Sequence, residues 1–288
     1  MSELTRAEVL VEALPYIRRF AGRTVVVKYG GNALAGTSEH DALALFAEDI
    51  VLMHTVGIRP VVVHGGGPQI NEMLSRLNIE SKFVNGLRVT DEATMQVVQM
   101  VLNGSVNPQI VSAINVHGNV AVGLSGEDGR TLQVTARDVS LGFVGDIAKV
   151  RTHVIEGLLA DGLVPVLSTV GVDVDGQPYN INADTAAGAI AEALGAEKIV
   201  YLTDIAGLRK DIDDATSLIQ RITVDELSAL IADGTISGGM IPKVESCMQA
   251  VRGGVKSAHI LDGRIAHVLL LELFTDQGVG TMITGVKQ

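Results

Sequence analysis

Two short hydrophobic runs, each followed at once by glycines, constrain the fold of this chain more than any other feature. The first reads VVVKYGGNAL, with Gly30 and Gly31, and the second reads VVVHGGGPQI, with Gly65, Gly66 and Gly67. A β-branched run favours a buried strand, and glycine lets the backbone turn sharply and approach a ligand closely. A helix after such a turn adds free N–H groups that attract anions. Each run therefore predicts a strand-to-helix turn that can hold a phosphate, although a ligand-free turn has the same pattern.

The alternation of strand and helix continues along the 288 residues. The predicted strands cover residues 24–29, 60–64, 120–123, 164–169, 198–203 and 257–262. The predicted helices cover residues 41–56, 68–77, 91–102, 108–116, 183–194, 224–232 and 243–252. Strands separated by helices require a mostly parallel sheet with right-handed crossovers, and hence an α/β fold. Weaker alternation in residues 131–150 indicates a hairpin insertion, and VLLLELF and GVGTMI are expected to be the last extended segments.

A further helix is predicted at residues 4–20, before the first strand. Leu4, Val11, Leu14 and Ile17 can share one face of it, and Pro15 is expected to kink it. Because this helix precedes the core, we expect it to project outward as an arm. The character of the candidate functional residues changes near residue 195. The expected division is therefore an arm (1–22), an N-terminal lobe (23–195) and a C-terminal lobe (196–288).

Composition and charge narrow the class of protein. A hydrophobic content of 47% with 32 glycines and 3% aromatics suits strands buried on both faces, although genomic composition bias can also enrich alanine and valine. A net charge of -11 argues against a nucleic-acid binder, so positive contacts to small anions must be few and local. The single cysteine, Cys247, excludes an intrachain disulfide. We expect a cytoplasmic protein, because neither a signal peptide nor a membrane-spanning apolar run is present.

Two common nucleotide fingerprints are absent. A dinucleotide-binding G-x-G-x-x-G motif needs glycine three residues after Gly67, where the chain has Ile70, and no P-loop string occurs. The remaining possibility is an unrelated phosphate cradle built from paired turns.

Three charged residues suit phosphoryl transfer, which needs positive charge around the phosphate oxygens. Lys28 ends the first predicted strand, and Lys243 lies in GGMIPKVES at the start of a predicted helix. Asp184 lies in the polar cluster NINADT. An ordinary surface lysine at 243 and a simple helix cap around 184 are the alternatives for these patterns.

At these residues the chain resembles the amino acid kinase family. The likeness runs in order through KYGGNAL, VVVHGGGPQIN, NGLRVTD, NINADTAAGAIAEALGAEKI, LTDIAGL, GGMIPKVES and LFTDQGVGTMI, which span nearly the whole chain. KYGG and HGGG indicate only the wider family, whereas NGLRVTD and NINAD are much more specific within it. The resemblance implies a three-layer αβα sandwich with a mostly parallel central sheet. The N-terminal lobe would hold the amino acid, and the C-terminal lobe would hold ATP and the regulatory site.

The resemblance also implies roles for individual residues. Lys28 and Lys243 would stabilise the transferring phosphoryl group, and Asp184 would hold both lysines. The phosphate cradle would be Gly30, Gly31 and Gly65, with an additional N–H from Gly66. N-acetyl-L-glutamate would contact Gly66, Gly67, Arg88 and Asn180, where the planar guanidinium suits bidentate capture of a carboxylate. The nucleotide would contact Thr203, Asp204, Gly207, Leu208 and Gly239.

The implied reaction needs no general base. A glutamate side chain titrates near pH ~4.3, so the attacking γ-carboxylate is already ionised at neutral pH. The site must instead overcome repulsion between two anions, with ATP as co-substrate and Mg²⁺ bound.

The N-terminal helix and the chain ending resemble the subclass of this family that forms hexamers, as trimers of dimers, and is inhibited by L-arginine. Candidate arginine contacts are Tyr16, Lys198, His267, Glu272 and Gly278. Glu272 could pair with the arginine guanidinium or be a surface glutamate.

Three alternatives remain open. The chain could be a sister kinase that acts on glutamate, aspartate, carbamate or UMP, although NGLRVTD argues against this. It could be a catalytically silent arginine sensor, which retention of the lysines and Asp184 disfavours. A dinucleotide-dependent oxidoreductase is disfavoured by the failed fingerprint. We expect neither nucleic acid nor membrane as a partner.

Overall fold

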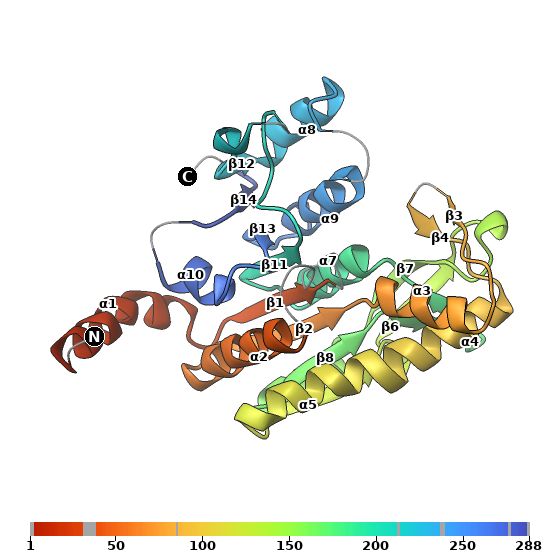
Figure 1. Ribbon diagram of the computed structural model, residues 1–288, viewed down its shortest axis with the longest axis horizontal. Coiled ribbons are helices and arrows are strands. Elements are labelled where there is room, and N and C mark those ends of the chain that lie inside the picture. The colour runs from red at the N-terminus through yellow and green to blue at the C-terminus, as the bar shows by residue number, and fades with distance from the viewer. Residues whose placement is uncertain are drawn as a thin grey trace.

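A single large sheet forms the centre of the molecule. The computed structural model describes residues 3–30, 39–84, 86–211, 214–236, 240–275 and 278–286. Within these residues, eight strands lie in the order β12-β14-β13-β11-β1-β2-β8-β5, and only the pair β13–β14 is antiparallel (Figure 1). They are β1 (Thr24–Tyr29), β2 (Arg59–His64), β5 (Ala121–Ser125), β8 (Val164–Ser168), β11 (Lys198–Thr203), β12 (Arg221–Thr223), β13 (Ser257–Asp262) and β14 (Thr281–Thr284). The predicted α/β fold with a mostly parallel sheet is confirmed.

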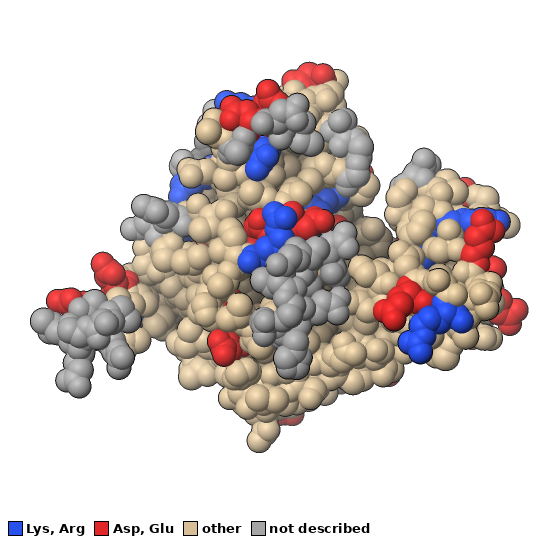
Figure 2. Space-filling view, viewed as in Figure 1, with Lys and Arg blue, Asp and Glu red and all other residues tan. Residues whose placement is uncertain are grey.

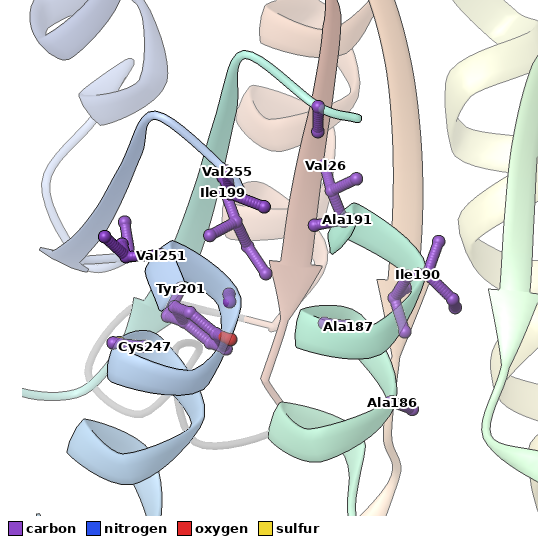
Figure 3. Close-up of a cluster of buried hydrophobic side chains, with 14 of the residues drawn as sticks. Val26, Ala186, Ala187, Ile190, Ala191, Ile199, Tyr201, Cys247, Val251 and Val255 are labelled. Atoms are coloured by element: carbon purple, nitrogen blue, oxygen red, sulfur yellow. The ribbon is translucent and has the colours of Figure 1, made fainter. Parts of the chain in front are cut away.

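Helices cover both faces of this sheet and make three layers. In β1, Val25 and Val27 face one hydrophobic core while Val26 faces the other, because successive strand residues point to opposite faces. The first core contains α2 (Glu39–Thr55), α3 (Gly67–Arg76), α4 (Glu92–Val101), α5 (Asn107–His117) and α10 (Val268–Phe274). The second contains α6 (His153–Ala160), α7 (Ala183–Ala193), α8 (Val224–Ala232) and α9 (Met240–Arg252). Small side chains such as Ala187 bring α7 close to the sheet (Figure 3).

Two smaller sheets flank the central one. The hairpin of β3 (Phe83–Val84) and β4 (Leu87–Arg88) rises beside α3 and α4 (Figure 1). The other sheet has the strand order β10-β9-β6-β7, built from β6 (Leu132–Ala136), β7 (Gly145–Val150), β9 (Val170–Val172) and β10 (Pro178–Asn180). Strands β6 and β7 pair antiparallel, which confirms the hairpin predicted within residues 131–150.

The prediction that VLLLELF is extended was wrong, because this segment is the helix α10. Val268, Leu269 and Leu273 are buried on one side of it. A short apolar run fits a buried strand or a buried helix equally well, and only its neighbours decide between them. The end of GVGTMI does form a strand, β14.

The helix α1 (Glu3–Phe20) contains Pro15 and extends away from the sheet, as expected for an arm (Figure 1). The apolar face predicted for it is not buried within one chain, since Val11 is 69% exposed and Leu14 is 41% exposed. No helix in the described part of the chain is long and apolar enough to span a membrane.

The segment between α4 and α5 is a π-helical turn, Leu102–Val106. One extra residue enters the turn there, which changes the direction of the following side chains. On the face drawn in Figure 2, acidic and basic side chains are interspersed, so positive charge on that face is local.

Gly171 in β9 provides a test of core packing. A Cβ at this position would lie 2.7 Å from Ile181 Cδ1 and 2.8 Å from the backbone oxygen of Leu132. We expect Gly171→Ala to lower the free energy of unfolding by about 1–3 kcal/mol in urea, the usual cost of overpacking. The control is Gly157→Ala in α6, where nothing lies within 4 Å and the helix should gain up to ~1 kcal/mol. Equal unfolding midpoints for the two variants would contradict this packing.

Candidate active site

Asp184 joins the two lysines singled out from the sequence. Lys28 Nζ lies 2.9 Å from Asp184 Oδ1, and Lys243 Nζ lies 2.9 Å from Asp184 Oδ2. Lys28 comes from β1, Asp184 from the first turn of α7 and Lys243 from the first turn of α9. All three side chains are 11–15% exposed, so the group is largely enclosed. One carboxylate thus holds two ammonium groups on one side of the sheet.

The polar cluster before α7 is both a helix cap and part of this site. Asn182 is the N-cap, and its Oδ1 accepts hydrogen bonds from the backbone N–H groups of Asp184 and Thr185 at 2.9 and 3.1 Å. Because Asn182 makes the cap, the carboxylate of Asp184 is free to turn toward the lysines. The alternative that Asp184 is only an acidic cap residue is therefore wrong.

The electrostatics of the group keep Asp184 ionised. Burial by itself would raise the pKa of Asp184, but Lys28 and Lys243 outweigh it and hold that pKa well below the usual range. Tyr201 packs beneath the group, with its ring 5.9 Å from Lys243 Nζ and its hydroxyl 3.4 Å from the backbone oxygen of Asp184. Figure 3 shows Tyr201 beside Cys247, whose thiol has a pKa raised by burial.

The glycine turns lie next to these charges. Gly30 is buried, and a Cβ there would lie 2.9 Å from Lys28 Nζ, so only glycine leaves room for the ammonium group. Gly65 approaches Ala183, the residue before Asp184, so closely that an added Cβ would lie 3.2 Å from the Ala183 Cβ. Gly31, also predicted for the phosphate cradle, lies outside the described residues.

The predicted substrate residues surround one cavity of about 160 Å³. Its lining includes Gly65, Gly66, Gly67, Arg88 and Asn180. The structure therefore brings together residues from the turn after β2, from α3, from β4 and from β10, which lie far apart in the sequence.

Arg88 and Asn180 are held in place at this cavity. Arg88 Nη1 donates to Ser81 Oγ, its Nη2 donates to the backbone oxygen of Gly67 at 3.3 Å, and its guanidinium lies 4.7 Å from the Phe83 ring centroid. Burial lowers the pKa of Arg88, which nonetheless carries its charge at neutral pH. Asn180 Nδ2 donates to Thr90 Oγ1 at 3.3 Å. The cavity thus offers a cation and an amide to an anionic ligand.

A second cavity, of about 590 Å³, is lined by residues from the C-terminal part of the chain. Asp204, Gly207 and Leu208 line it, as predicted for the nucleotide. Thr203 does not line it, but its hydroxyl donates to Asp204 Oδ1 at 3.2 Å. Gly239 lies outside the described residues.

Sequence reasoning missed Ile236, Met240 and Arg264, which also line this cavity. Arg264 follows β13, the neighbour of β11 in the sheet, and its Nε and Nη2 donate to the Asp262 carboxylate at 2.8 and 2.7 Å. The position of Arg264 after a predicted strand was the available signal.

A third cavity, of about 410 Å³, lies between α1, α10 and the first residues of β11 and β13. Four of the five predicted arginine contacts line it, namely Tyr16, Lys198, Glu272 and Gly278. Glu272 is 8% exposed, so it is not a surface glutamate, and its carboxylate receives Lys198 Nζ at 3.4 Å.

His267 does not belong to this group. It precedes α10, and its Nδ1 lies 2.6 Å from Asp49 Oδ1 of α2, outside the lining of the third cavity. The histidine that reaches Glu272 is His259 of β13, with its Nδ1 at 2.8 Å. His259 follows the strand period and is wholly buried, so the sequence marked it only as a core residue.

Comparisons with known proteins agree with this geometry. A model of the amino acid kinase family matches residues 23–262. Acetylglutamate kinase of Thermoanaerobacter pseudethanolicus is 54% identical over 284 residues, covering 98% of this chain and 94% of that protein. The crystal structure of N-acetylglutamate synthase from Neisseria gonorrhoeae complexed with coenzyme A and N-acetyl-glutamate matches with TM-score 0.85 and 28% identity, covering 100% of this chain and 65% of that one. Its complex with coenzyme A and L-arginine matches with TM-score 0.82 and 28% identity, covering 99% and 66%. This chain therefore spans about two thirds of the synthase.

Asp184→Asn tests the enclosed charge group. The amide leaves two ammonium groups without their anion, so we expect the free energy of unfolding to fall by about 3–5 kcal/mol at pH 7. Because the folded pKa of Asp184 is depressed, its stabilisation is present above pH ~4 and is lost as the pH falls below that value. The difference from wild type should therefore shrink in acid, as measured by urea unfolding at several pH values.

Glu72→Gln is the matched control for this carboxylate-to-amide change. Glu72 pairs with Arg76 at 3.9 Å, and both side chains are about 70% exposed, at 72% and 69%. The expected cost is at most about 1 kcal/mol. A similar cost for the two variants would show that the Asp184 group is no more coupled than a surface pair.

Proposed function

Since the chain belongs to the amino acid kinase family, we propose that it is an acetylglutamate kinase. It transfers the γ-phosphoryl group of ATP to the γ-carboxylate of N-acetyl-L-glutamate, giving N-acetyl-L-glutamyl 5-phosphate and ADP, in arginine biosynthesis. The observation that carries this proposal is the group of Lys28, Asp184 and Lys243, whose members lie close in the chain to the linings of two cavities. Asp184 follows Ala183, which lines the smaller cavity, and Lys243 lies one helical turn after Met240, which lines the larger.

The smaller cavity suits the amino-acid substrate. In the proposed complex, Arg88 binds the α-carboxylate, while Asn180 and the amides of Gly66 and Gly67 hold the rest of the molecule. The substrate identity is supported by the 54% identity over 98% of the chain to a protein named acetylglutamate kinase. Arg88 and Asn180, which the sequence motifs assign to the substrate, are among the polar side chains that line this cavity.

The chemistry follows from charge. The substrate carboxylate is ionised near neutral pH, so the γ-carboxylate oxygen attacks phosphorus directly and the bond to the bridging oxygen of ADP breaks. The two lysines offset the repulsion between carboxylate and triphosphate, and Asp184 keeps both ammonium groups at one point. Backbone N–H groups of the glycine turns add fixed donors to the phosphoryl oxygens. Alignment of the two bound substrates contributes much of the remaining rate enhancement.

The larger cavity suits ATP. Its described lining comes wholly from residues 204–264, whereas that of the smaller cavity comes from residues 65–183. This supports the division into an amino-acid lobe (23–195) and an ATP lobe (196–288).

Mg²⁺ is proposed to accompany ATP and to neutralise phosphate charge. Among the described residues, no group of three or more His, Cys, Asp or Glu side chains could hold a metal ion. Mg²⁺ that accompanies a nucleotide is usually held by phosphate oxygens, waters and one or two carboxylates, and so needs no dedicated cage of protein ligands.

The decisive assay is ATP-dependent formation of an acyl phosphate that hydroxylamine traps. N-acetyl-L-glutamate should be the best substrate in a panel with glutamate, aspartate, carbamate and UMP. Preference for another acceptor would point to a sister kinase, and no turnover with any acceptor would leave a silent arginine sensor.

Removing either lysine should depress turnover. We expect Lys28→Ala and Lys243→Ala each to lower kcat by about 100-fold or more, the scale of losing one electrostatic stabiliser. Lys149→Ala, on the exposed part of β7, is the control and should keep wild-type turnover. Near-normal kcat in either active-site variant would refute the assigned role.

L-arginine is the proposed inhibitor, bound in the third cavity. Glu272 offers a carboxylate to a guanidinium, Lys198 offers an ammonium group to a carboxylate, and Tyr16 brings α1 into the same site. The gonococcal synthase complexed with L-arginine shares this fold, which supports the ligand class. The exposed apolar residues Leu10 and Val11 of α1 suit contacts between subunits, so we propose a hexamer built as a trimer of dimers.

Arginine should raise the half-saturating concentration of N-acetyl-L-glutamate. Glu272→Gln should weaken this inhibition at least about tenfold, because the buried carboxylate no longer pairs with the guanidinium. Deletion of residues 1–20 should yield dimers in light scattering and also remove Tyr16 from the cavity. Turnover indifferent to millimolar arginine, or a truncated protein that remains hexameric, would refute this part.

A further inference from the structure

A buried hydrogen-bond network lies behind the triple-glycine turn, and the mechanism above does not use it. Its centre is His64, the last residue of β2, whose side chain is fully buried. His64 Nε2 lies 3.0 Å from Asn107 Nδ2, and His64 Nδ1 lies 3.0 Å from the backbone oxygen of Gly65. The ring therefore connects the helix α5 to the first peptide of the glycine turn.

The contacts assign one tautomer to His64. Asn107 Nδ2 also lies 2.8 Å from the backbone oxygen of Val166, which can only accept a hydrogen bond. This end of the Asn107 amide is therefore the nitrogen, and it donates to His64 Nε2. The imidazole proton must then be on Nδ1, where it is donated to the Gly65 oxygen. Burial lowers the pKa of His64 to about 4, so the ring stays neutral near pH 7.

This hydrogen bond determines the orientation of a peptide in the turn. In a trans peptide, the C=O of Gly65 and the N–H of Gly66 point in opposite directions. Because the Gly65 oxygen faces His64, the Gly66 N–H points away from the ring. Gly66 and Gly67 line the smaller cavity, and the first N–H groups of α3 have no acceptor within the helix.

The π-helical turn Leu102–Val106 packs against the triple-glycine turn. A Cβ on Gly66 would lie 2.7 Å from Leu102 Cδ2 and 3.1 Å from Val106 Cγ2. The backbone of the glycine turn therefore packs directly on these two side chains. Asn107 follows immediately and reaches across the sheet edge, where a Cβ on Gly123 would lie only 2.1 Å from its Oδ1. The network thus fits only because two glycines leave room for it.

The same turn fixes the end of a second strand. Asn103 Oδ1 accepts a hydrogen bond from Ser168 Oγ, at the end of β8, at 2.5 Å. Asn103 Nδ2 donates to Glu127 Oε2 at 3.1 Å. Thr169, which follows Ser168, lines the smaller cavity. Asn103 and Asn107 therefore support two adjacent walls of that cavity from behind.

We propose that His64 is a positioning residue for phosphoryl transfer, held by Asn107 in its Nδ1–H form so that it orients the Gly65–Gly66 peptide. The glycine amides then face the transferring group. His64 itself touches neither substrate nor phosphate. The inference rests on the proposed function, because it assigns His64 to the same glycine turn.

Two substitutions separate the two bonds of the ring. The amide nitrogen of Asn can occupy the place of His Nδ1. His64→Asn therefore keeps the hydrogen bond to the Gly65 oxygen and loses the hydrogen bond with Asn107. The amide oxygen of Gln can occupy the place of Nε2. His64→Gln therefore keeps the hydrogen bond from Asn107 and loses the donor to the Gly65 oxygen. We expect His64→Asn to retain kcat within about fivefold of wild type and His64→Gln to lose a further tenfold or more, roughly the effect of a misplaced oxyanion donor. KM for ATP should stay within about twofold, because this network does not line the larger cavity.

A role in packing alone predicts a different result. Both His64 variants would then lose activity in proportion to their thermal stability, and equal kcat values would overturn the proposal. Asn107→Asp provides a second test with His64 intact, since the carboxylate accepts a hydrogen bond from Nε2–H and so favours the tautomer without a proton on Nδ1. We expect at least about a tenfold loss of kcat in this variant, and unchanged kcat would also overturn the proposal.

The activity of the wild-type protein separates failure of the proposed function from failure of the role of His64. If it forms no acyl phosphate from N-acetyl-L-glutamate and ATP, the proposed function fails. If it turns over normally while His64→Gln matches His64→Asn, only the role of His64 fails.

Discussion

The shared carboxylate of Asp184 is the interaction on which the rest of the site depends. It places the ammonium groups of Lys28 and Lys243 2.9 Å from its two oxygens and so ties β1, α7 and α9 together at one point. Two like charges in a largely enclosed site would otherwise repel each other and draw in water. One anion between two cations leaves a net positive charge, which is what a site for two anionic substrates requires.

The backbone around this group is adapted to its size. Small residues let α7 lie close to the sheet, and the buried ring of Tyr201 supports Lys243 from below. The glycine turns then approach the same point because no Cβ intervenes at Gly30 or Gly65. The site needs both the lysine charges and the close approach of the backbone, since backbone donors act on phosphate only at hydrogen-bonding distance.

Sequence reasoning worked where local pattern and tertiary environment agree. The β-branched runs and helical spacings predicted most elements of the central sheet and its helices, because a buried parallel strand has an unmistakable composition. It failed for α10, whose seven apolar-rich residues fit either element. It also chose His267 over His259 for the third cavity. His259 is marked only by its position on β13, and its partner Glu272 is brought to it by the packing of α10.

What the sequence determined by itself is the local chemistry: strands that end in glycine, a lysine before the first turn, and an amide-rich helix start. These depend on backbone sterics and neighbouring residues, which the order of amino acids specifies directly. The family resemblance implied that Asp184 holds both lysines, and the tertiary structure brings the three side chains into contact. Only the tertiary structure decided that His64 supports a glycine turn through Asn107. The physical reason is that these contacts join residues distant in the chain. Their distances depend on how helices pack on the sheet, and a one-residue change such as the π-helical turn redirects the side chains that make them.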